Sequence, residues 1–325
     1  MTGIDVTGVG LLVTVQDLGR TGFLGQGITT GGAVDGFALQ CANRLAGNPD
    51  SLAGLEIVLA GMQLTLREQA TIAFYGASVP IQIDGEVQDM GQPIDVAAGC
   101  AIDVGASRTG TYTYMAVRGG IDTPPVLGSR STVVRESLGG LMGRGLEKGD
   151  VLPIGQPPMA HLSHHNVRGR VCAPTRGEPR ADRILTLRYV PGFQYEQVDS
   201  NCRSNLVTQT YAVTGAANRM AVPLDGARLE TGLSRLRSEA TCLGSIQVPP
   251  DGKPIVLLND RQTMGGYPQM GVVLPADCAL LGQGRPGLKV KFQEVTITEA
   301  EQLVWLARHY EETHLSALEK LWGMS

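Results

Sequence analysis

The chain has 325 residues, of which 42% are hydrophobic and 18% are charged, and its formal net charge is −4. This composition is typical of an ordered soluble protein, and its acidic balance excludes nucleic acid and anionic membranes as expected partners. No run of about 18 apolar residues occurs, and the N-terminus MTGIDVTG lacks the basic and apolar regions of a signal peptide, so we expect a cytoplasmic protein. Glycine is abundant (43 residues) and aromatic residues are scarce (5%), which favours a β-rich architecture with many turns.

The first predicted elements are a short strand and a helix. Leu11–Val15 is an apolar β-type run that ends in the polar, turn-rich stretch Gln16–Arg20. The helix, near residues 35–46, begins at the N-cap Asp35 and ends before Gly47. Its buried stripe is expected to hold Phe37, Cys41 and Leu45.

Short β runs dominate the next part of the chain. They are Leu55–Leu59, Gln63–Leu66, Thr71–Tyr75, Ile81–Ile83 with Val87, and Thr111–Val117. The dipeptide Asp84-Gly85 separates two of them, and Asp-Gly between alternating runs is a strong hairpin signal.

A glycine-rich stretch, Gly119–Gly149, follows the last of these runs. It contains GSRST (Gly128–Thr132), and its glycines free the backbone for close approach to another group. Between Pro153 and Pro179 the composition shifts to Pro, His, Arg and Gly without apolar periodicity. We therefore predict an N-terminal β-rich domain over residues 1–155, a linker over 156–180 and a C-terminal domain over 181–325.

The second half again reads mainly as strands. The predicted strands are Ile184–Val190, Leu206–Val213, Ser245–Val248, Pro254–Leu258, Gly271–Leu274 and Leu288–Phe292. The sequence Thr298-Glu299-Ala300-Glu301 has the capping-box pattern and is followed by helical spacing of leucines, which predicts one long or broken C-terminal helix.

Two nucleotide-binding patterns can be judged from their surroundings. Gly282–Gly287 matches G-x-G-x-x-G, but Pro286 and a β run follow it where a dinucleotide site requires a helix, so we interpret it as a turn. No P-loop occurs, because Gly252-Lys253 is followed by proline and lacks the upstream glycine.

Histidines and cysteines give no metal or redox signature. His161, His164 and His165 lie in the predicted linker without a carboxylate or cysteine at ligand spacing, so no metal is expected. His309 and His314 lie in the last predicted helix, away from the glycine-rich loops, so no histidine general base is expected. The cysteines form no C-x-x-C pair and are expected to be reduced: Cys41, Cys100, Cys172, Cys202, Cys242 and Cys278.

Candidate site residues are the polar side chains of loops that also carry turn residues. The predicted substrate-binding residues are Gln16, Asp17, Arg20, Arg130, Ser131, Thr132, Arg219, Gln247 and Thr263. The predicted catalytic residues are Asp260, Arg261 and Tyr267. An alternative is that the turns flanking Pro254–Leu258 are only decorated hairpin turns and that the arginines form structural ion pairs.

Several ordered segments, spread from about residue 8 to 295, resemble one family. They are VQDLGR (Val15–Arg20), GGAVDGFALQCANRLAGN (Gly31–Asn48), LE (Leu55–Glu56), GGID (Gly119–Asp122), GSRST, GGLMGRGLEKGDVLPIG (Gly139–Gly155), IQVPPDGKPIVLLNDRQTMGGYP (Ile246–Pro268) and RPG (Arg285–Gly287). The family is that of allophanate hydrolase subunit 2, KipA and the 5-oxoprolinase C subunits, within the biotin-dependent carboxyltransferase superfamily and related to urea amidolyase.

The resemblance implies a mostly β protein with two packed, cyclophilin-like β-barrel domains and a few helices, including a C-terminal one. It also implies a subunit-1-type (KipI-like) carboxyltransferase partner, with a LamB/YcsF-type third subunit as a further candidate. The substrate implied is a small amide. ATP is expected at the level of the complex, and biotin only if another chain supplies it, because no lysine here stands in an A-M-K-M setting.

Family members differ in chemistry, and three readings stay open. For a free-standing subunit of this length the resemblance favours an ATP-hydrolysing 5-oxoprolinase, which converts 5-oxoproline to glutamate. The alternatives are a carboxyltransferase half-module for a urea- or allophanate-like amide that uses carboxybiotin, and a non-catalytic, KipA-like regulatory subunit.

The sequence departs from the family pattern at two places. Val190–Phe193 stands where Gly-Pro is usual, and Arg219–Leu224 lacks a second arginine before its leucine, which removes a possible anion contact. As a working mechanism, Arg130 and Arg261 hold a carboxylate, carboxyl or phosphoryl group, and backbone N–H groups of the glycine-rich loops stabilise oxyanion charge. Asp260 or Tyr267 would manage the proton, while Asp17 and Asp35 are alternatively structural caps.

Overall fold

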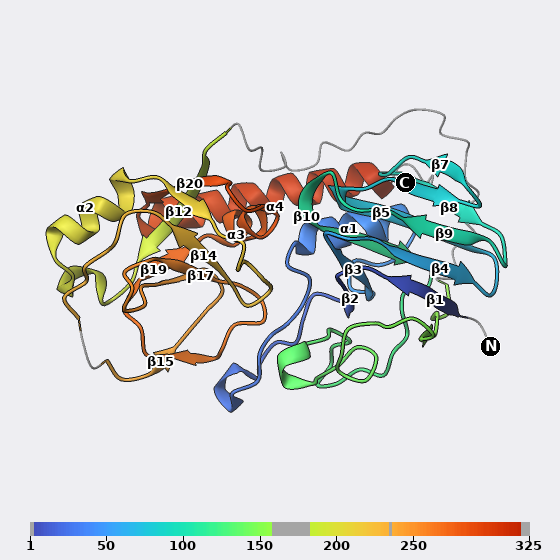
Figure 1. Ribbon diagram of the computed structural model, residues 1–325, viewed down its shortest axis with the longest axis horizontal. Coiled ribbons are helices and arrows are strands. Elements are labelled where there is room, and N and C mark those ends of the chain that lie inside the picture. Colours follow the sequence, from blue (N-terminus) through green and yellow to red (C-terminus); the bar gives the residue numbers. More distant parts are fainter. Residues whose placement is uncertain (1–2, 158–182, 234–235, 320–325) are drawn as a thin grey trace. The chain divides into compact units, whose positions relative to one another are not determined.

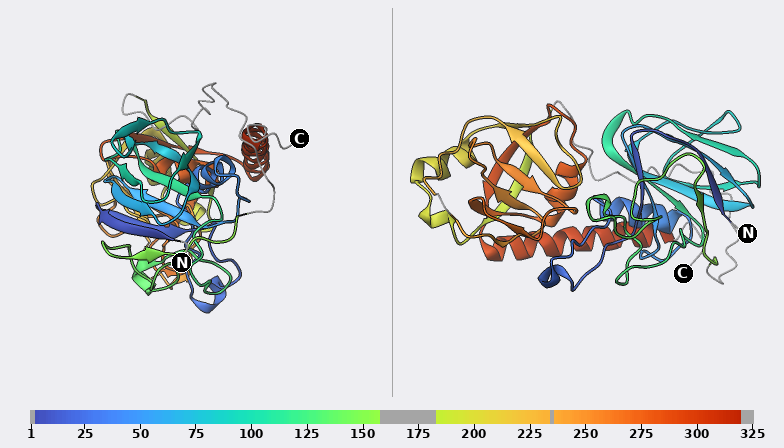
Figure 2. Two further views of the ribbon diagram at one scale, coloured as in Figure 1. Left: turned by 90° about the vertical axis from the view of Figure 1, so that its right-hand side faces the viewer. Right: turned by 60° about the horizontal axis from the view of Figure 1, so that its bottom comes forward.

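The computed structural model describes residues 3–157, 183–233 and 236–319 (Figures 1 and 2). The chain divides into two compact units. Unit 1 comprises Met1–Arg20, Gly31–Arg176 and Tyr310–Ser325, and unit 2 comprises Thr21–Thr30 and Gly177–His309. Most of the linker predicted at 156–180 lies outside the described residues. No helix in the described ranges is long and apolar enough to cross a membrane.

Unit 1 contains two antiparallel sheets. The six-stranded sheet has the order β11(Val151–Leu152)-β1(Ile4–Val9)-β4(Met62–Leu66)-β9(Ala101–Val104)-β6(Ile81–Ile83)-β7(Glu86–Gln88). The five-stranded sheet has the order β2(Leu12–Gln16)-β3(Gly54–Val58)-β10(Thr109–Val117)-β5(Ala70–Ser78)-β8(Pro93–Val96). One hydrophobic core draws side chains from both sheets, including Ile4, Val13, Leu55, Leu64, Phe74 and Ile102.

The hairpin and the helix predicted in this unit are both present. Asp84 and Gly85 join β6 to β7 with φ angles of 49° and 85°, and two consecutive positive φ values are typical of a type I′ turn. Helix α1 (Gly36–Leu45) begins after Asp35, whose carboxylate accepts a 3.1 Å hydrogen bond from the Ala38 N–H. The expected stripe of Phe37, Cys41 and Leu45 is buried. One 3-10 turn, η2 (Val134–Glu136), lies in a loop of this unit.

Unit 2 is built on a closed barrel. The strand order is β12(Leu185–Pro191)-β19(Gln269–Val273)-β16(Ser245–Gln247)-β17(Ile255–Leu257)-β14(Ala221–Asp225)-β13(Tyr211–Val213)-β20(Lys289–Glu294), and the parallel pair β12–β20 closes it. A separate two-stranded ribbon consists of β15 (Glu239–Ala240) and β18 (Met264–Gly265). Unit 2 also contains helices α2 (Ser200–Thr208) and α3 (Pro275–Gly282) (Figure 1), the 3-10 turns η1 (Leu24–Gln26) and η3 (Tyr195–Gln197), and the first part of helix α4 (Ile297–Glu319). The mostly β fold with few helices is therefore confirmed.

Two predictions in unit 2 are wrong in detail. The strand predicted over Leu206–Val213 is helical as far as Thr208, because the Asp199 side chain caps α2 and Leu206 is buried on its apolar side. The capping box of α4 (Ile297–Glu319) is formed by Thr296 and Glu299, not by residues 298 and 301. Helix α4 is unbroken, its residues up to His309 belonging to unit 2 and those from Tyr310 to unit 1.

The interpretation of Gly282–Gly287 as a turn is confirmed. The segment begins at the last residue of helix α3 and precedes strand β20, which is the reverse of the strand-then-helix order of a dinucleotide site.

Candidate functional site

The predicted site residues of unit 1 gather around the carboxylate of Asp17. This carboxylate accepts hydrogen bonds from the hydroxyls of Ser129 (2.6 Å) and Ser131 (2.5 Å) and from the backbone N–H groups of Gly19 (2.8 Å) and Arg130 (2.6 Å). Three of these bonds end on Oδ1, and the bond from the Arg130 N–H ends on Oδ2. Asp17 therefore fastens the GSRST loop to the end of strand β2.

Gln16, Arg20 and Thr132 extend this cluster inward. Gln16 Nε2 donates to the Thr132 carbonyl at 3.0 Å, and Arg20 Nη2 donates to the Ser131 carbonyl at 2.5 Å. Arg20 is only 2% exposed. The side chain of Arg130 lies apart, since it pairs with Asp122 at 2.5 Å on an exposed part of the loop.

The glycines beyond this loop approach the chain itself. A Cβ atom on Gly139 would lie 2.1 Å from the Ser131 carbonyl oxygen, and one on Gly140 would lie 1.9 Å from Thr132 Oγ1. The N–H groups of Gly140 and Gly143 already bond to the carbonyls of Arg130 and Gly139. The close approach expected from the sequence is thus internal packing.

In unit 2, Asp260 forms a buried ion pair with Arg219. Arg219 Nε and Nη2 donate to the two carboxylate oxygens at 2.9 and 2.8 Å, and the Asp260 N–H donates to the Arg219 carbonyl at 2.9 Å. The side chains are 7% and 10% exposed. Because both carboxylate oxygens of Asp260 face the guanidinium, its geometry is that of a structural pair.

Arg261, the next residue, is a buried cation of a different kind. It is 5% exposed, its Nη1 donates to the Leu258 carbonyl at 3.3 Å, and its Nε meets no acceptor in the described part of the chain. Burial lowers the pKa of this guanidinium, yet arginine remains protonated in proteins. Its backbone is fixed by Thr29, whose hydroxyl donates to the Arg261 carbonyl at 3.0 Å.

Gln247 is a second buried donor with spare capacity. It is 4% exposed, and among the residues that the structure describes its Nε2 finds no hydrogen-bond partner. A Cβ atom on Gly265 of the ribbon would lie 2.4 Å from this nitrogen. Glycine at 265 therefore lets the ribbon backbone lie directly against the Gln247 carboxamide.

A pocket of about 640 Å³ adjoins these residues along the chain, because Val248 follows Gln247 and Gly266 follows Gly265. We call it the unit 2 pocket. It is lined by Arg228, Leu229, Glu230, Thr231, Leu233, Leu236, Val248, Pro249, Pro250, Gly252, Gly266, Tyr267 and Pro268. Tyr267 is 45% exposed at this pocket, whereas Thr263 contributes a backbone bond, its carbonyl accepting from the Thr241 N–H at 3.0 Å.

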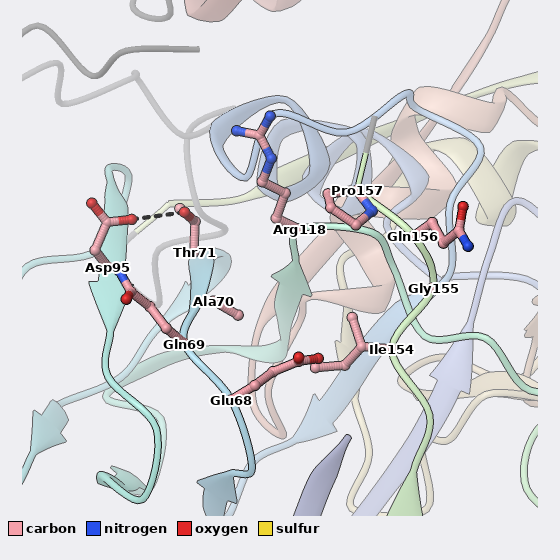
Figure 3. A pocket seen from close by; sticks show the side chains of 10 residues that line it. All are labelled: Glu68, Gln69, Ala70, Thr71, Asp95, Arg118, Ile154, Gly155, Gln156 and Pro157. Carbon is pink, nitrogen blue, oxygen red and sulfur yellow. Dashed lines mark hydrogen bonds between the residues drawn. The ribbon is translucent and has the colours of Figure 1, made fainter. Parts of the chain in front are cut away.

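A second pocket, of about 440 Å³, lies in unit 1 and contains none of the predicted residues (Figure 3). Thr71 donates to Asp95 at 2.7 Å on one side of it, and Glu68 and Arg118 lie on other sides. Its full lining is Glu68, Gln69, Ala70, Thr71, Asp95, Arg118, Ile154, Gly155, Gln156 and Pro157. No local motif in the sequence joins these segments.

Buried side-chain atoms without a hydrogen-bond partner among the described residues occur in both units. They include Gln16 Oε1 and Arg130 Nε in unit 1, and the N–H donors Arg261 Nε and Gln247 Nε2 in unit 2. A buried cation suits a carboxylate, and a neutral amide donor suits a carbonyl oxygen. Over the described ranges, no group of three or more His, Cys, Asp and Glu side chains is placed to hold a metal ion.

Residues 26–294 match the profile of a family described as carboxyltransferase domain, subdomain A and B. The chain is 33% identical over 314 residues to the 5-oxoprolinase C-type subunit of Escherichia coli, covering 93% of this chain and 98% of that one. It is 31% identical over 320 residues to the corresponding 5-oxoprolinase chain of Haemophilus influenzae, covering 98% of each. It is also 29% identical to the urea amidolyase of Lachancea kluyveri, over 92% of this chain but 17% of that protein.

Solved structures agree with these sequence matches. The crystal structure of the Kluyveromyces lactis urea amidolyase superposes with a TM-score of 0.84 at 26% identity, over 98% of this chain and 20% of that one.

Proposed function

The chain belongs to the carboxyltransferase domain family, subdomains A and B, and from this membership we propose that it is the C-type subunit of an ATP-dependent 5-oxoprolinase. In this role it works with a subunit-1-type partner and a LamB/YcsF-type subunit to open the lactam ring of 5-oxoproline, giving glutamate. ATP is used by the assembled complex.

The observation that carries the proposal is the extent of the matches. The similarity covers 98% of both 5-oxoprolinase C subunits, whereas it covers 17% of the urea amidolyase of Lachancea kluyveri. When a chain matches a separate subunit over nearly its whole length, the simplest expectation is that it has the same role in the complex.

The donors in unit 2 support the same substrate. 5-Oxoproline carries a carboxylate and a lactam carbonyl, and the buried Arg261 and Gln247 offer a cationic and a neutral donor, respectively. Tyr267 lines the adjoining pocket. We assign the carboxylate to Arg261 and the carbonyl to Gln247, while the proton-transfer roles of Asp260 and Tyr267 stay predictions.

The fold likeness to urea amidolyase supports a second candidate. In it, the chain is half of a carboxyltransferase module for a urea-like amide, and another polypeptide delivers carboxybiotin. A regulatory, KipA-like role is the outcome if neither chemistry depends on the polar residues of unit 2.

The test is ATP-dependent release of glutamate from 5-oxoproline by this chain mixed with its partner subunits, each omitted in turn. We expect release to require this chain and to be lost in Arg261→Met, while Arg67→Met, which alters an exposed arginine of unit 1, retains it. Release that continues without this chain refutes the proposal. Transfer of a carboxyl group from carboxybiotin to urea, with no glutamate release, would favour the second candidate.

A further inference from the structure

Three glutamine side chains are buried where the β15–β18 ribbon meets the barrel. Gln194 precedes η3, while Gln247 and Gln269 are cross-strand neighbours on β16 and β19, and their exposures are 3%, 4% and 9%. Burying a carboxamide destabilises the folded state unless its N–H groups and its oxygen find hydrogen-bond partners. The partners of each therefore indicate what the group does.

Two of the three tie the ribbon to the barrel. Gln194 accepts a 2.7 Å hydrogen bond from the Gln269 N–H and donates at 3.1 Å to the carboxylate of Glu239 on β15. Gln269 Nε2 donates at 3.4 Å to the carbonyl of Ala240, also on β15. The first ribbon strand is thus fixed to the start of β19.

The third glutamine faces the second ribbon strand. Glu239 of β15 pairs with Gly265 of β18, so fixing β15 also fixes Gly265. Gly265 in turn lies against Gln247, because any side chain there would begin 2.4 Å from Gln247 Nε2. The ribbon backbone consequently limits the positions that the Gln247 carboxamide can adopt.

We propose that Gly265, Gln194 and Gln269 are positioning residues, which hold the Gln247 carboxamide so that its N–H group binds the carbonyl oxygen of the substrate amide. The assignment of a lactam carbonyl rests on the proposed function. The positioning device itself requires only a ligand with an amide or urea oxygen.

The chemistry of the donor selects this class of ligand atom. A primary amide nitrogen donates and does not accept, so its missing partner is an acceptor. A neutral donor competes poorly with a buried guanidinium for a carboxylate, because hydrogen bonds between charged groups are stronger. A neutral carbonyl oxygen is the matching partner.

Replacing the carbonyl oxygen by sulfur tests the contact, since sulfur is a weak acceptor. The KM values of 5-oxoproline and its thiolactam are compared for the assembled complex. The preference is the ratio of the thiolactam KM to the 5-oxoproline KM. We expect this ratio to be about tenfold larger for the wild-type complex than for the Gln247→Leu complex, because about one net hydrogen bond is lost in the variant. Gly265→Ala should lose the same preference, because its methyl group displaces the flexible carboxamide end rather than backbone.

Control and partial variants separate positioning from general damage. Gly215→Ala, whose methyl group would meet nothing within 4 Å, should keep the full preference. Gln194→Leu and Gln269→Leu should reduce the preference for 5-oxoproline over its thiolactam. They should change the ratio of the two KM values more than they change the thiolactam KM itself. A preference that survives in both Gln247→Leu and Gly265→Ala overturns the inference.

The outcome also distinguishes this inference from the proposed function. If the complex acts on urea and not on 5-oxoproline, the proposed function fails, and the comparison of urea with thiourea takes the place of the lactam pair. Loss of the oxygen preference in the same two variants then supports the inference. A complex that prefers neither oxygen compound overturns it.

Discussion

Arg219 and Asp260 face each other with two parallel hydrogen bonds, of 2.9 and 2.8 Å, and a third bond joins their backbones. The pair connects the residues before β14 with the loop after β17 and places Arg261 immediately beyond it. The orientation of the buried Arg261 cation therefore depends on an ion pair one residue away.

Replacing Asp260 by alanine should destabilise the protein strongly. The change leaves the Arg219 guanidinium buried without its carboxylate, which typically costs about 3–5 kcal/mol. Arg67→Ala, which breaks a pair with Asp5 whose side chains are 38% and 35% exposed, should cost under about 1 kcal/mol. Urea denaturation measures both, and equal losses would contradict the structural role of the Asp260 pair. Lost turnover in Asp260→Ala is then no evidence for a catalytic base.

Gly139→Ala should be far more destabilising than Gly128→Ala. Both glycines have a left-handed φ, +70° and +78°, so both variants incur about 1–2 kcal/mol of backbone strain. Only at Gly139 would the new methyl group also lie 2.1 Å from the Ser131 carbonyl oxygen, whereas at Gly128 nothing lies within 4 Å. The difference between the two free energies of unfolding therefore measures the clash, and its absence would refute the internal packing of this loop.

Local patterns predicted most elements of the fold, because those elements are determined by neighbouring residues. Asp84-Gly85 fixes its hairpin through two positive φ angles, and Asp35 caps α1 through its own side chain. The prediction of a strand at Leu206–Thr208 was wrong because these residues, although compatible with a strand, form the end of a helix whose N-cap is Asp199, seven residues before Leu206. Propensity is a weak guide where a cap and a buried face decide.

The candidate site was less predictable, since its properties depend on distant partners. The sequence shows Asp17 and Ser131 in separate loops, and it does not show that they share one hydrogen-bond network. It singled out Gln247 without Gln194 or Gln269, because the three share a site only once the barrel closes. Gln247 and Gln269 are polar residues at strand ends, whereas Gln194 precedes a 3-10 turn.

Lowering the pH should weaken the packing of His314 in unit 1. Burial lowers the pKa of His314, whose ring lies 5.5 Å from that of Phe37 and whose Nε2 lies 3.2 Å from the Tyr75 hydroxyl. The unfolded state therefore binds a proton at His314 more readily than the folded state does. The packing of the neutral ring stabilises the protein fully above pH 6.5, the usual pKa of histidine, and this stabilisation is lost as the pH falls through the lower pKa of the folded state. Unfolding free energies from about pH 7.5 to about 5 should fall more steeply for wild type than for His314→Phe. If the unfolding free energies of the two proteins fall in parallel, protonation of His314 is not the cause of the loss of stability.

An anionic ligand should stabilise the protein through Arg261. A carboxylate bound to the buried guanidinium adds a charge-assisted hydrogen bond worth about 1.5–3 kcal/mol, or roughly 10- to 100-fold in affinity. We expect 5-oxoproline to raise the Tm of the assembled complex in wild type, and to do so much less in Arg261→Met. Arg261→Lys should fail to restore the effect, because an ammonium lacks the planar donor geometry. An equal rise in all three proteins would place the carboxylate elsewhere.

Gln247→Leu should leave the protein as stable as wild type while impairing its activity. The Gln247 Nε2 has no acceptor in the described residues, so leucine removes a desolvated donor and keeps most of the buried volume. We expect the free energy of unfolding to change by less than about 1 kcal/mol or to rise. Gln194→Leu, which breaks bonds to both Gln269 and Glu239, should instead lower it by about 1–3 kcal/mol. If the Gln247 variant were the less stable of the two, its amide would serve the fold, and the binding role argued for it would lose its physical basis.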